Sequence, residues 1–296
     1  MVVLSLFDGI SCGRLALQRA GIEVDKYFAS EIDKDAIKVT MNNFPDTIQI
    51  GDVYNVHYKD GKLITDNGTF EVNIDLLIGG SSCQSLSTGN PNATGLAEGG
   101  KSHIFFEFLR LRDEIKPKYW LLENVKCANK YRDAISQYLG VHPVLIDSAL
   151  VSYQHRPRYY WSNMKFGQPK DKHINFQDYK EEEVSPDDIT MFSKSPCNVK
   201  AYNLTVRDEK AKYRYRDVTN SDKVYTLMCK KDRPSQSVIM CNGFMRSLTR
   251  KELELAQTLP LGYTDGLTYH QAHKVIGNGW TVDVIAHILK EGITNG

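Results

Sequence analysis

Cys83 stands in the polar stretch SSCQSLSTGN, directly after an apolar run at residues 75–78 and two glycines. Serine, glutamine and glycine on both sides are unsuited to an apolar core, so we expect this thiol to face a polar cleft. A thiolate in such a place is a nucleophile when cationic or amide neighbours lower its pKa. The sequence therefore predicts a reactive cysteine. The alternative is a small buried hydrophobic residue, a common setting for a free cysteine.

Three carboxylic acids close other apolar runs. Glu31 follows KYFAS, Asp52 follows Gly51, and Glu123 ends the run WLL. In α/β nucleoside-binding folds an acid near the end of the second strand accepts ribose hydroxyls, and a carboxyl group at the end of an apolar strand can donate a proton. We expect Glu31 and Asp52 at a cofactor site and Glu123 in proton transfer, with ordinary loop or surface acids as the alternative.

Two glycines and two arginines add groups that bind anions. FDGISCG places Gly9 and Gly13 in a turn after a strand and before a helix, although it lacks the GxGxxG of dinucleotide binders. Arg156 and Arg158 stand two residues apart, so an extended chain would point both to one side, where they can hold a phosphate or a base carbonyl. A plain turn and a solvated face are the alternatives. Together, glycines and acids at several strand ends favour an adenosine-type cofactor.

The elements that must position these residues alternate between strand and helix in the first half of the chain. Such repeats predict a doubly wound α/β fold, with a parallel sheet covered by helices and ligands at the carboxyl edge. A helix is predicted through HIFFEFLRLRDEI, ended by Lys116-Pro117. The predicted strands are VVLSLFD, KYFASEID, NIDLLIGG, YWLLEN and HPVLIDSALV.

From about residue 163 to 245 the sequence is polar and loop-rich. Residues 194–233 hold eleven Lys or Arg against five Asp or Glu, a local surplus of six positive charges. KAKYRYR alternates basic and aromatic residues, as a strand with one basic face would; a solvated strand over a small core is the alternative. After 245, Thr249 and Glu252 form a capping box at the start of a helix, and GNGWTVDVIAHILKEG predicts a loop leading into an amphipathic helix.

Composition sets the class of protein. The 296 residues are 41% hydrophobic and 25% charged, as in globular domains, and no apolar run reaches the roughly 20 residues of a membrane span. The N-terminus lacks the features of a signal peptide. Six cysteines without a CxxC pair predict reduced cytoplasmic thiols, with neither disulfides nor a metal site. The net charge of +1 neither demands nor excludes nucleic acid.

These stretches, in this order, resemble the DNA cytosine-5 methyltransferases over nearly the whole chain outside 163–245. The first and tenth motifs look most like the de novo branch of animals. In the catalytic loop Ser82 replaces the family's proline, which loosens the loop. The matching stretches are FDGISCGRLALQRAG, the acid of ASEID, GDV, Ser82-Cys83-Gln84, Glu-Asn-Val at 123–125, Gln154 with Arg156 and Arg158, RSLTRKELELAQTLP and GNGWTVDVI.

The resemblance implies an α/β fold with a Rossmann-like, S-adenosylmethionine-dependent methyltransferase core and a smaller inserted target-recognition domain. The implied domains are the core at 1–162, target recognition at 163–245 and a C-terminal return to the core at 246–296. The implied reaction transfers a methyl group to C5 of a flipped-out cytosine in duplex DNA through a covalent bond from Cys83 to C6. Glu123 would protonate N3, Arg158 would bind the cytosine carbonyl side, and Arg156 would orient the loop or a phosphate.

The same resemblance assigns the remaining site residues. The cofactor residues are Phe7, Asp8, Gly9, Gly13, Glu31, Ile32, Asp52, Val53, Asn278 and Trp280, and the substrate residues are Gln84, Ser87, Asn124 and Gln154. The enzyme is expected to act as a cytoplasmic, nucleoid-associated monomer on double-stranded DNA in a bacterial or phage-infected cell. Three alternatives stay open: a catalytically silent DNA-binding homologue, a tRNA cytosine-5 methyltransferase of the same fold, and an enzyme with a variant cofactor or base.

Overall fold

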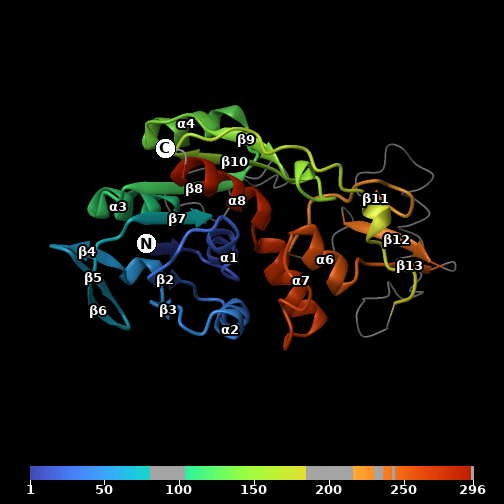
Figure 1. Ribbon diagram of the computed structural model, residues 1–296, viewed down its shortest axis with the longest axis horizontal. Coiled ribbons are helices and arrows are strands. Elements are labelled where there is room, and N and C mark those ends of the chain that lie inside the picture. The colour runs from blue at the N-terminus through green and yellow to red at the C-terminus, as the bar shows by residue number, and fades with distance from the viewer. Residues whose placement is uncertain (81–103, 185–215, 230–235, 242–243, 295–296) are drawn as a thin grey trace. The chain divides into compact units, whose positions relative to one another are not determined.

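The computed structural model describes residues 1–80, 104–184, 216–229, 236–241 and 244–294 (Figure 1). The chain divides into two compact units. The first unit comprises Met1–Asp147, Pro157–Pro169 and Val282–Gly296, and the second comprises Ser148–Arg156 and Lys170–Thr281.

A seven-stranded sheet in the order β3-β2-β1-β7-β8-β10-β9 forms the centre of the first unit. The five strands from β3 to β8 are parallel, and β10 is antiparallel to both β8 and β9. The strands are β1 (Val2–Leu6), β2 (Lys26–Ser30), β3 (Ile48–Gln49), β7 (Leu76–Gly80), β8 (Tyr119–Val125), β9 (Val144–Asp147) and β10 (Pro157–Ser162). The helices are α1 (Cys12–Arg19), α2 (Lys34–Asn43), α3 (Phe105–Ile115), α4 (Asn129–Leu139) and α8 (Val282–Leu289), which the π-helix η6 (Lys290–Thr294) follows.

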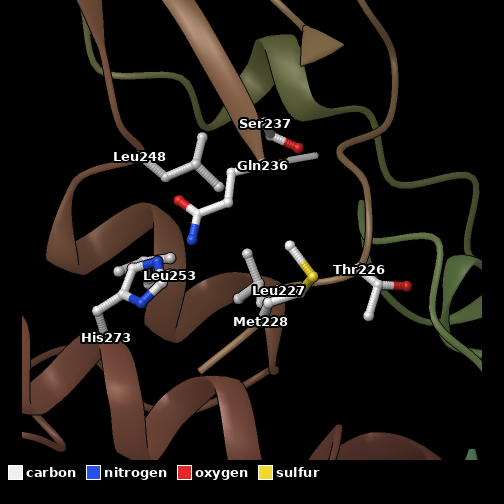
Figure 2. Close-up of a pocket in the computed structure, with 8 residues that line it drawn as sticks. All are labelled: Thr226, Leu227, Met228, Gln236, Ser237, Leu248, Leu253 and His273. Atoms are coloured by element: carbon white, nitrogen blue, oxygen red, sulfur yellow. The ribbon is translucent and has the colours of Figure 1, made fainter. Parts of the chain in front are cut away.

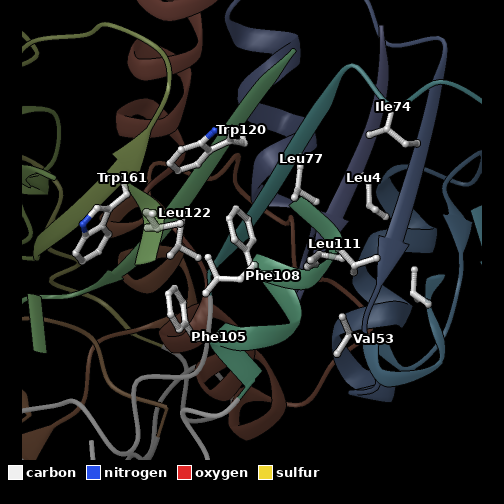
Figure 3. Close-up of a cluster of buried hydrophobic side chains, with 14 of the residues drawn as sticks. Leu4, Val53, Ile74, Leu77, Phe105, Phe108, Leu111, Trp120, Leu122 and Trp161 are labelled. Atoms are coloured by element: carbon white, nitrogen blue, oxygen red, sulfur yellow. The ribbon is translucent and has the colours of Figure 1, made fainter. Parts of the chain in front are cut away.

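Both faces of this sheet are buried, which explains why its central strands are continuous apolar runs. On one face Leu4 and Leu77 pack in a hydrophobic cluster with Phe108 of α3 (Figure 3). The alternate residues Val3 and Ile78 are equally buried but lie outside that cluster. Because successive side chains of a strand point to opposite faces, both layers of the α/β fold are filled.

The predicted α/β fold is confirmed, with one difference in strand direction. The last two strands, β9 and β10, are antiparallel neighbours joined by Ser148–Arg156, a stretch that belongs to the second unit. Antiparallel neighbours need no crossover helix, whereas parallel ones do. The expectation of a wholly parallel sheet was therefore wrong for β10.

The helix predicted through 103–115 corresponds to α3. It ends at Ile115, and Lys116 takes a left-handed conformation at φ 50° before Pro117. The amphipathic helix predicted after GNGW corresponds to α8, which packs against α1. Both helices follow the residue pattern closely because their apolar faces repeat with helical spacing.

A small antiparallel sheet between β3 and β7 was not predicted. It consists of β4 (His57–Lys59), β5 (Lys62–Thr65) and β6 (Gly68–Glu71), and it follows the short 3-10 helix η1 (Val53–Asn55). Asp60-Gly61 and Asp66-Asn67 form its two turns, and dipeptides of these types are typical of tight hairpins.

The second unit contains the helices α6 (Arg250–Ala256) and α7 (Tyr269–Asn278). The predicted capping box is confirmed, since Thr249 and Glu252 bond reciprocally at the start of α6. The Glu252 carboxylate also forms a buried ion pair with Arg246, with Oε2 and Nη1 2.8 Å apart. The second unit also contains the strands β11 (Arg216–Asp217), β12 (Ser237–Cys241) and β13 (Phe244–Arg246) and the short 3-10 helices η3 (Ser148–Leu150) and η4 (Phe176–Asp178).

The two units divide the second half of the chain differently from the predicted domains. Residues 246–281 group with the second unit, and only Val282–Gly296 groups with the first. The roles predicted for 163–245 and 246–296 stay predictions. The stretch KAKYRYR lies outside the described residues except for Arg216 in β11. Within the described ranges, no helix has the length and apolarity needed to cross a membrane.

Candidate active site

The turn from β1 to α1 is built from left-handed backbone. Phe7, Gly9 and Ser11 have φ values of 56°, 61° and 55°. Only glycine takes this conformation without steric cost. A Cβ atom added at Gly9 would have no neighbour within 4 Å, so space lies open beside this residue. Gly13 is buried in the first turn of α1. The predicted glycine turn therefore exists and presents backbone to open space.

The Asp8 carboxylate lies within the same turn. It accepts hydrogen bonds from the Ser11 hydroxyl and from the Tyr27 hydroxyl, the latter at 2.7 Å. Burial raises the pKa of Asp8 to about 6, although hydrogen bonds from Ser11, Ser5 and Tyr27 act in the opposite direction. This side chain therefore gains or loses its charge close to neutral pH.

Glu31 follows β2 and is held by backbone amides. Its Oε2 accepts from Gly9 N, and its Oε1 accepts from Ile32 N and Asp33 N, all at 2.8 Å. An ionised carboxylate has about four acceptor positions. These three bonds fix the carboxylate while leaving acceptor capacity, which is what binding of ribose hydroxyls would need.

The third acidic strand end lies next to Glu31, since β3 pairs with β2. The Asp52 carboxylate caps η1 by accepting from Tyr54 N at 3.2 Å, and Val53 is buried. In contrast, the side chain of Ile32 is 70% exposed. An isoleucine so exposed beside a fixed carboxylate offers an apolar surface that a planar ring can cover.

Glu123 and Arg158 form an ion pair on neighbouring strands. Because Tyr160 of β10 lies opposite Glu123 of β8, Arg158 is the diagonal neighbour of Glu123 on the same face. Arg158 Nε lies 3.0 Å from Glu123 Oε1, and both side chains are 11% exposed. Asn124 is buried, and its Oδ1 accepts from Val125 N. The structure thus brings together two of the four predicted catalytic residues.

The other predicted arginine, Arg156, belongs to the second unit and is buried. Its guanidinium donates to the carbonyls of Leu227, Gly277 and Gly279 at 2.9 to 3.1 Å. Gln154 is also buried, and its Oε1 accepts from Leu227 N at 2.8 Å. Within the second unit, the side chains of Arg156 and Gln154 therefore form hydrogen bonds to backbone groups of other segments. The sequence did not indicate this role.

Gln257 is a further residue of this network that the prediction missed. Its Nε2 donates to Ile276 O and Gly279 O, both at 3.0 Å, and its Oε1 accepts from Thr281 Oγ1 at 2.7 Å. Asn278, the last residue of α7, is exposed, and Trp280, which directly follows Gly279, is half-buried. The only sequence signal was a glutamine directly after Ala256, the last residue of α6.

The predicted nucleophile Cys83, its neighbour Ser82, and the substrate residues Gln84 and Ser87 lie outside the described residues. Among those that are described, no three His, Cys, Asp or Glu side chains gather in a way that would hold a metal ion.

None of the predicted site residues that the structure describes lines a small pocket in the second unit, although its lining residue Leu227 is hydrogen-bonded to Arg156 and Gln154. The pocket is lined by polar and apolar side chains in similar measure (Figure 2). The space open to the centre of a water molecule is about 10 Å³, about what one water needs, so it cannot hold a base or a nucleoside. The lining residues are Thr226, Leu227, Met228, Gln236, Ser237, Leu248, Leu253 and His273.

The mostly parallel sheet with its covering helices defines an α/β protein, and solved structures share this fold. The Entamoeba histolytica methyltransferase EhMeth superposes with a TM-score of 0.72 at 16% identity, covering 100% of this chain and 98% of that one. The S. pombe Dnmt2 methyltransferase superposes with a TM-score of 0.67 at 16% identity, covering 98% of this chain and 97% of that one.

The sequence comparisons match one family over the first part of the chain. Residues 1–137 match the model of the C-5 cytosine-specific DNA methylases. The orphan methyltransferase M.Rho11sI of Bacillus phage rho11s is 35% identical over 126 residues, which are 42% of this chain and 23% of the relative. The type II methyltransferase M.NgoPII of Neisseria gonorrhoeae is 31% identical over 142 residues, which are 47% of this chain and 38% of the relative.

A plant protein, DNA (cytosine-5)-methyltransferase DRM2 of Arabidopsis thaliana, is 32% identical over 121 residues, 39% of this chain and 19% of the relative. The predicted resemblance to the DNA cytosine-5 methyltransferases is confirmed by these matches. The matched stretches make up 19% to 38% of these three curated relatives.

Proposed function

We propose that this protein transfers a methyl group from S-adenosylmethionine to C5 of cytosine in double-stranded DNA. The observation that carries the proposal is the family match over residues 1–137, because that stretch contains Glu31, Asp52 and Glu123 near the carboxyl ends of parallel strands of one sheet, β2, β3 and β8. Ligands of open α/β sheets bind at this edge.

The residues at the strand ends fit the proposed cofactor, which supplies the methyl group. Glu31, fixed by three amides, would accept the ribose hydroxyls. Ile32 and Val53 would line the adenine, and Asp52 would accept its amino group. The open backbone at Gly9 would admit the methionine part. From the second unit, Asn278 and Trp280 are the proposed further contacts.

Cys83 would begin the reaction by adding its thiolate to C6 of the cytosine. The new S–C6 bond pushes electrons into the ring, where N3 takes a proton from Glu123 and C5 becomes able to accept the methyl group. A base then takes the C5 proton, the C6–S bond breaks to release the Cys83 thiolate, and N3 returns its proton to Glu123, which restores the aromatic base. Arg158 would hold Glu123 through Oε1 and stabilise the cytosine carbonyl. The base must be flipped out of the duplex first, at a cost of a few kcal/mol.

A methyl-transfer assay tests this proposal. Tritiated S-adenosylmethionine is incubated with the protein and either duplex DNA or tRNA, beside Cys83→Ala and the matched control Cys127→Ala. Cys127 is buried, and burial raises its pKa, which suits a structural thiol. We expect label in DNA that disappears with Cys83→Ala and persists with Cys127→Ala.

The other outcomes separate the alternatives. Label in tRNA but not in DNA would overturn the assigned substrate. DNA binding without transfer would identify a catalytically silent homologue. Transfer to DNA by Cys83→Ala at the wild-type rate would contradict the covalent mechanism. Bisulfite sequencing of DNA from expressing cells then gives the recognition sequence.

A further inference from the structure

The loop Gln49–Asn55 carries Asp52 and Val53, the proposed adenine-side residues. One side of this loop is fixed by β2. Ile50 N donates to Ala29 O at 2.9 Å, and Ser30 Oγ donates to Gly51 O at 2.8 Å. The loop therefore leaves the sheet along a defined path next to the strand end that carries Glu31.

The other side of the loop is held by two residues in the turn between β5 and β6. Asn67 Nδ2 donates to Gln49 O at 2.8 Å, and Asn55 Nδ2 donates to Asp66 Oδ2 at 2.8 Å. One turn is thus hydrogen-bonded to both ends of the loop. This turn belongs to the small sheet β4–β6.

Asp66 also lies directly against the middle of the loop. Gly51 has φ +79°, and a Cβ atom added there would lie 3.3 Å from Asp66 Oδ2. This left-handed φ favours glycine at the position before Asp52, and a side chain there would press against Asp66. The loop and the turn are therefore fitted to each other along their length.

The turn between β5 and β6 also has hydrogen bonds of its own, independent of its contacts with the loop. Thr65 Oγ1 donates to Gly68 O at 3.0 Å and accepts from Asn67 N at 3.1 Å, and Thr65 pairs with Gly68 across the hairpin. From α3, Arg110 Nη2 adds a bond to Val56 O at 2.8 Å, just beyond the loop. A loop held from three elements is ordered without a ligand.

We propose that Asp66 and Asn67 are positioning residues for the adenine end of S-adenosylmethionine. They hold Gln49–Asn55 in its binding conformation, so that the cofactor does not have to order the loop when it binds. The inference rests on the proposed function, because it takes Asp52 and Val53 as the residues that meet the adenine. It adds a second source of cofactor affinity, lying in a small sheet outside the matched motifs.

The test is the affinity for two adenosine compounds, measured by calorimetry. S-adenosylhomocysteine and methylthioadenosine share the adenosine part, but only the first has the amino-acid part. We expect Asp66→Ala and Asn67→Ala each to weaken both ligands by the same factor, about 3- to 10-fold, the value of one hydrogen bond. Asp66→Asn keeps an acceptor oxygen and should bind nearly as the wild type does.

The matched control is Glu71→Ala, which removes an exposed carboxylate from the same small sheet. We expect this variant to keep both affinities. Hydrogen exchange in the ligand-free proteins gives a second readout, with faster exchange at residues 49–56 in Asp66→Ala than in Glu71→Ala.

Three outcomes overturn the inference, and one of them also overturns the proposed function. If the wild type binds neither compound, the proposed cofactor is wrong and the inference fails with it. If the wild type binds the compounds and Asp66→Ala and Asn67→Ala bind them as tightly as the wild type does, only the inference fails. If Glu71→Ala weakens binding as much as Asp66→Ala does, the effect is general destabilisation and the inference is again wrong.

Discussion

At the scale of single residues, Asp8 makes the stability of the chain depend on pH through the turn between β1 and α1. Its carboxyl group has a pKa of about 6 in the folded chain against an ordinary value of 3.8. Between these two values the folded chain keeps the proton that the unfolded chain has released. The free energy of unfolding therefore falls as the pH rises from about 4 to about 6.

Asp8→Asn should remove this dependence, because the amide stays neutral. We expect the variant to gain stability relative to the wild type by about 2 kcal/mol as the pH rises across that window. Urea unfolding at several pH values measures the difference. Asp60→Asn, at an exposed turn position, controls for the substitution. A difference in the free energy of unfolding between Asp8→Asn and the wild type that stays constant over this pH range would contradict the assigned pKa.

Residues whose position in the fold depends on a local pattern were predictable. Glu31, Asp52 and Glu123 each follow an apolar run, and parallel neighbouring strands bring such ends to one edge. Burial of Arg156 and Gln154 was not predictable, because their partners Leu227 and Gly279 lie more than 70 residues away. Two arginines in similar sequence contexts thus have different surroundings, one paired with Glu123 and the other with carbonyl groups.

At the scale of elements, Gln257 joins the end of α6 to the loop after α7. Four buried bonds meet at its amide, from Gln154 and Thr281 and to the carbonyls of Ile276 and Gly279. A buried polar group that loses its partner costs about 1 to 3 kcal/mol. The segment with Asn278 and Trp280 is therefore held by this side chain together with Arg156, which donates to Gly277 O and Gly279 O.

We expect Gln257→Ala to lower the free energy of unfolding by about 2 to 4 kcal/mol, since it removes four buried hydrogen bonds at once. The matched control is Gln168→Ala, which removes one exposed bond to Leu145 O and should cost less than about 0.5 kcal/mol. Denaturant unfolding of both variants measures these values. Equal losses in the two variants would show that the network contributes nothing beyond an ordinary surface bond.

The elements differ in how far the sequence determines them. Helices α3 and α8 were predicted because apolar spacing and a Lys-Pro stop are local signals. The direction of β10 was not, because it depends on the partner strand and not on the residues of β10 itself. The sheet β4–β6 was missed because three strands of three or four residues are too short to show a clear alternation.

At the scale of the whole molecule, charge is distributed very unevenly along the chain. The net charge is +1, yet residues 194–233 carry a surplus of six. The family match ends at residue 137, so the proposed DNA contacts of this segment rest on its charge alone. Binding to phosphates releases counterions, and affinity then falls with salt in proportion to the phosphates contacted.

This relation makes the proposed DNA contact measurable. Replacing Lys210, Lys212 and Arg214 by Gln should lower the slope of log affinity against log salt by about 3, about one for each lost phosphate contact. Fluorescence anisotropy with a labelled duplex at several salt concentrations gives that slope. The control triple is Lys26, Lys59 and Lys118, exposed lysines of the first unit, whose replacement changes the net charge equally. If both triples lower the slope alike, overall charge and not the basic segment governs DNA binding, and the assignment of 163–245 to target recognition loses its support.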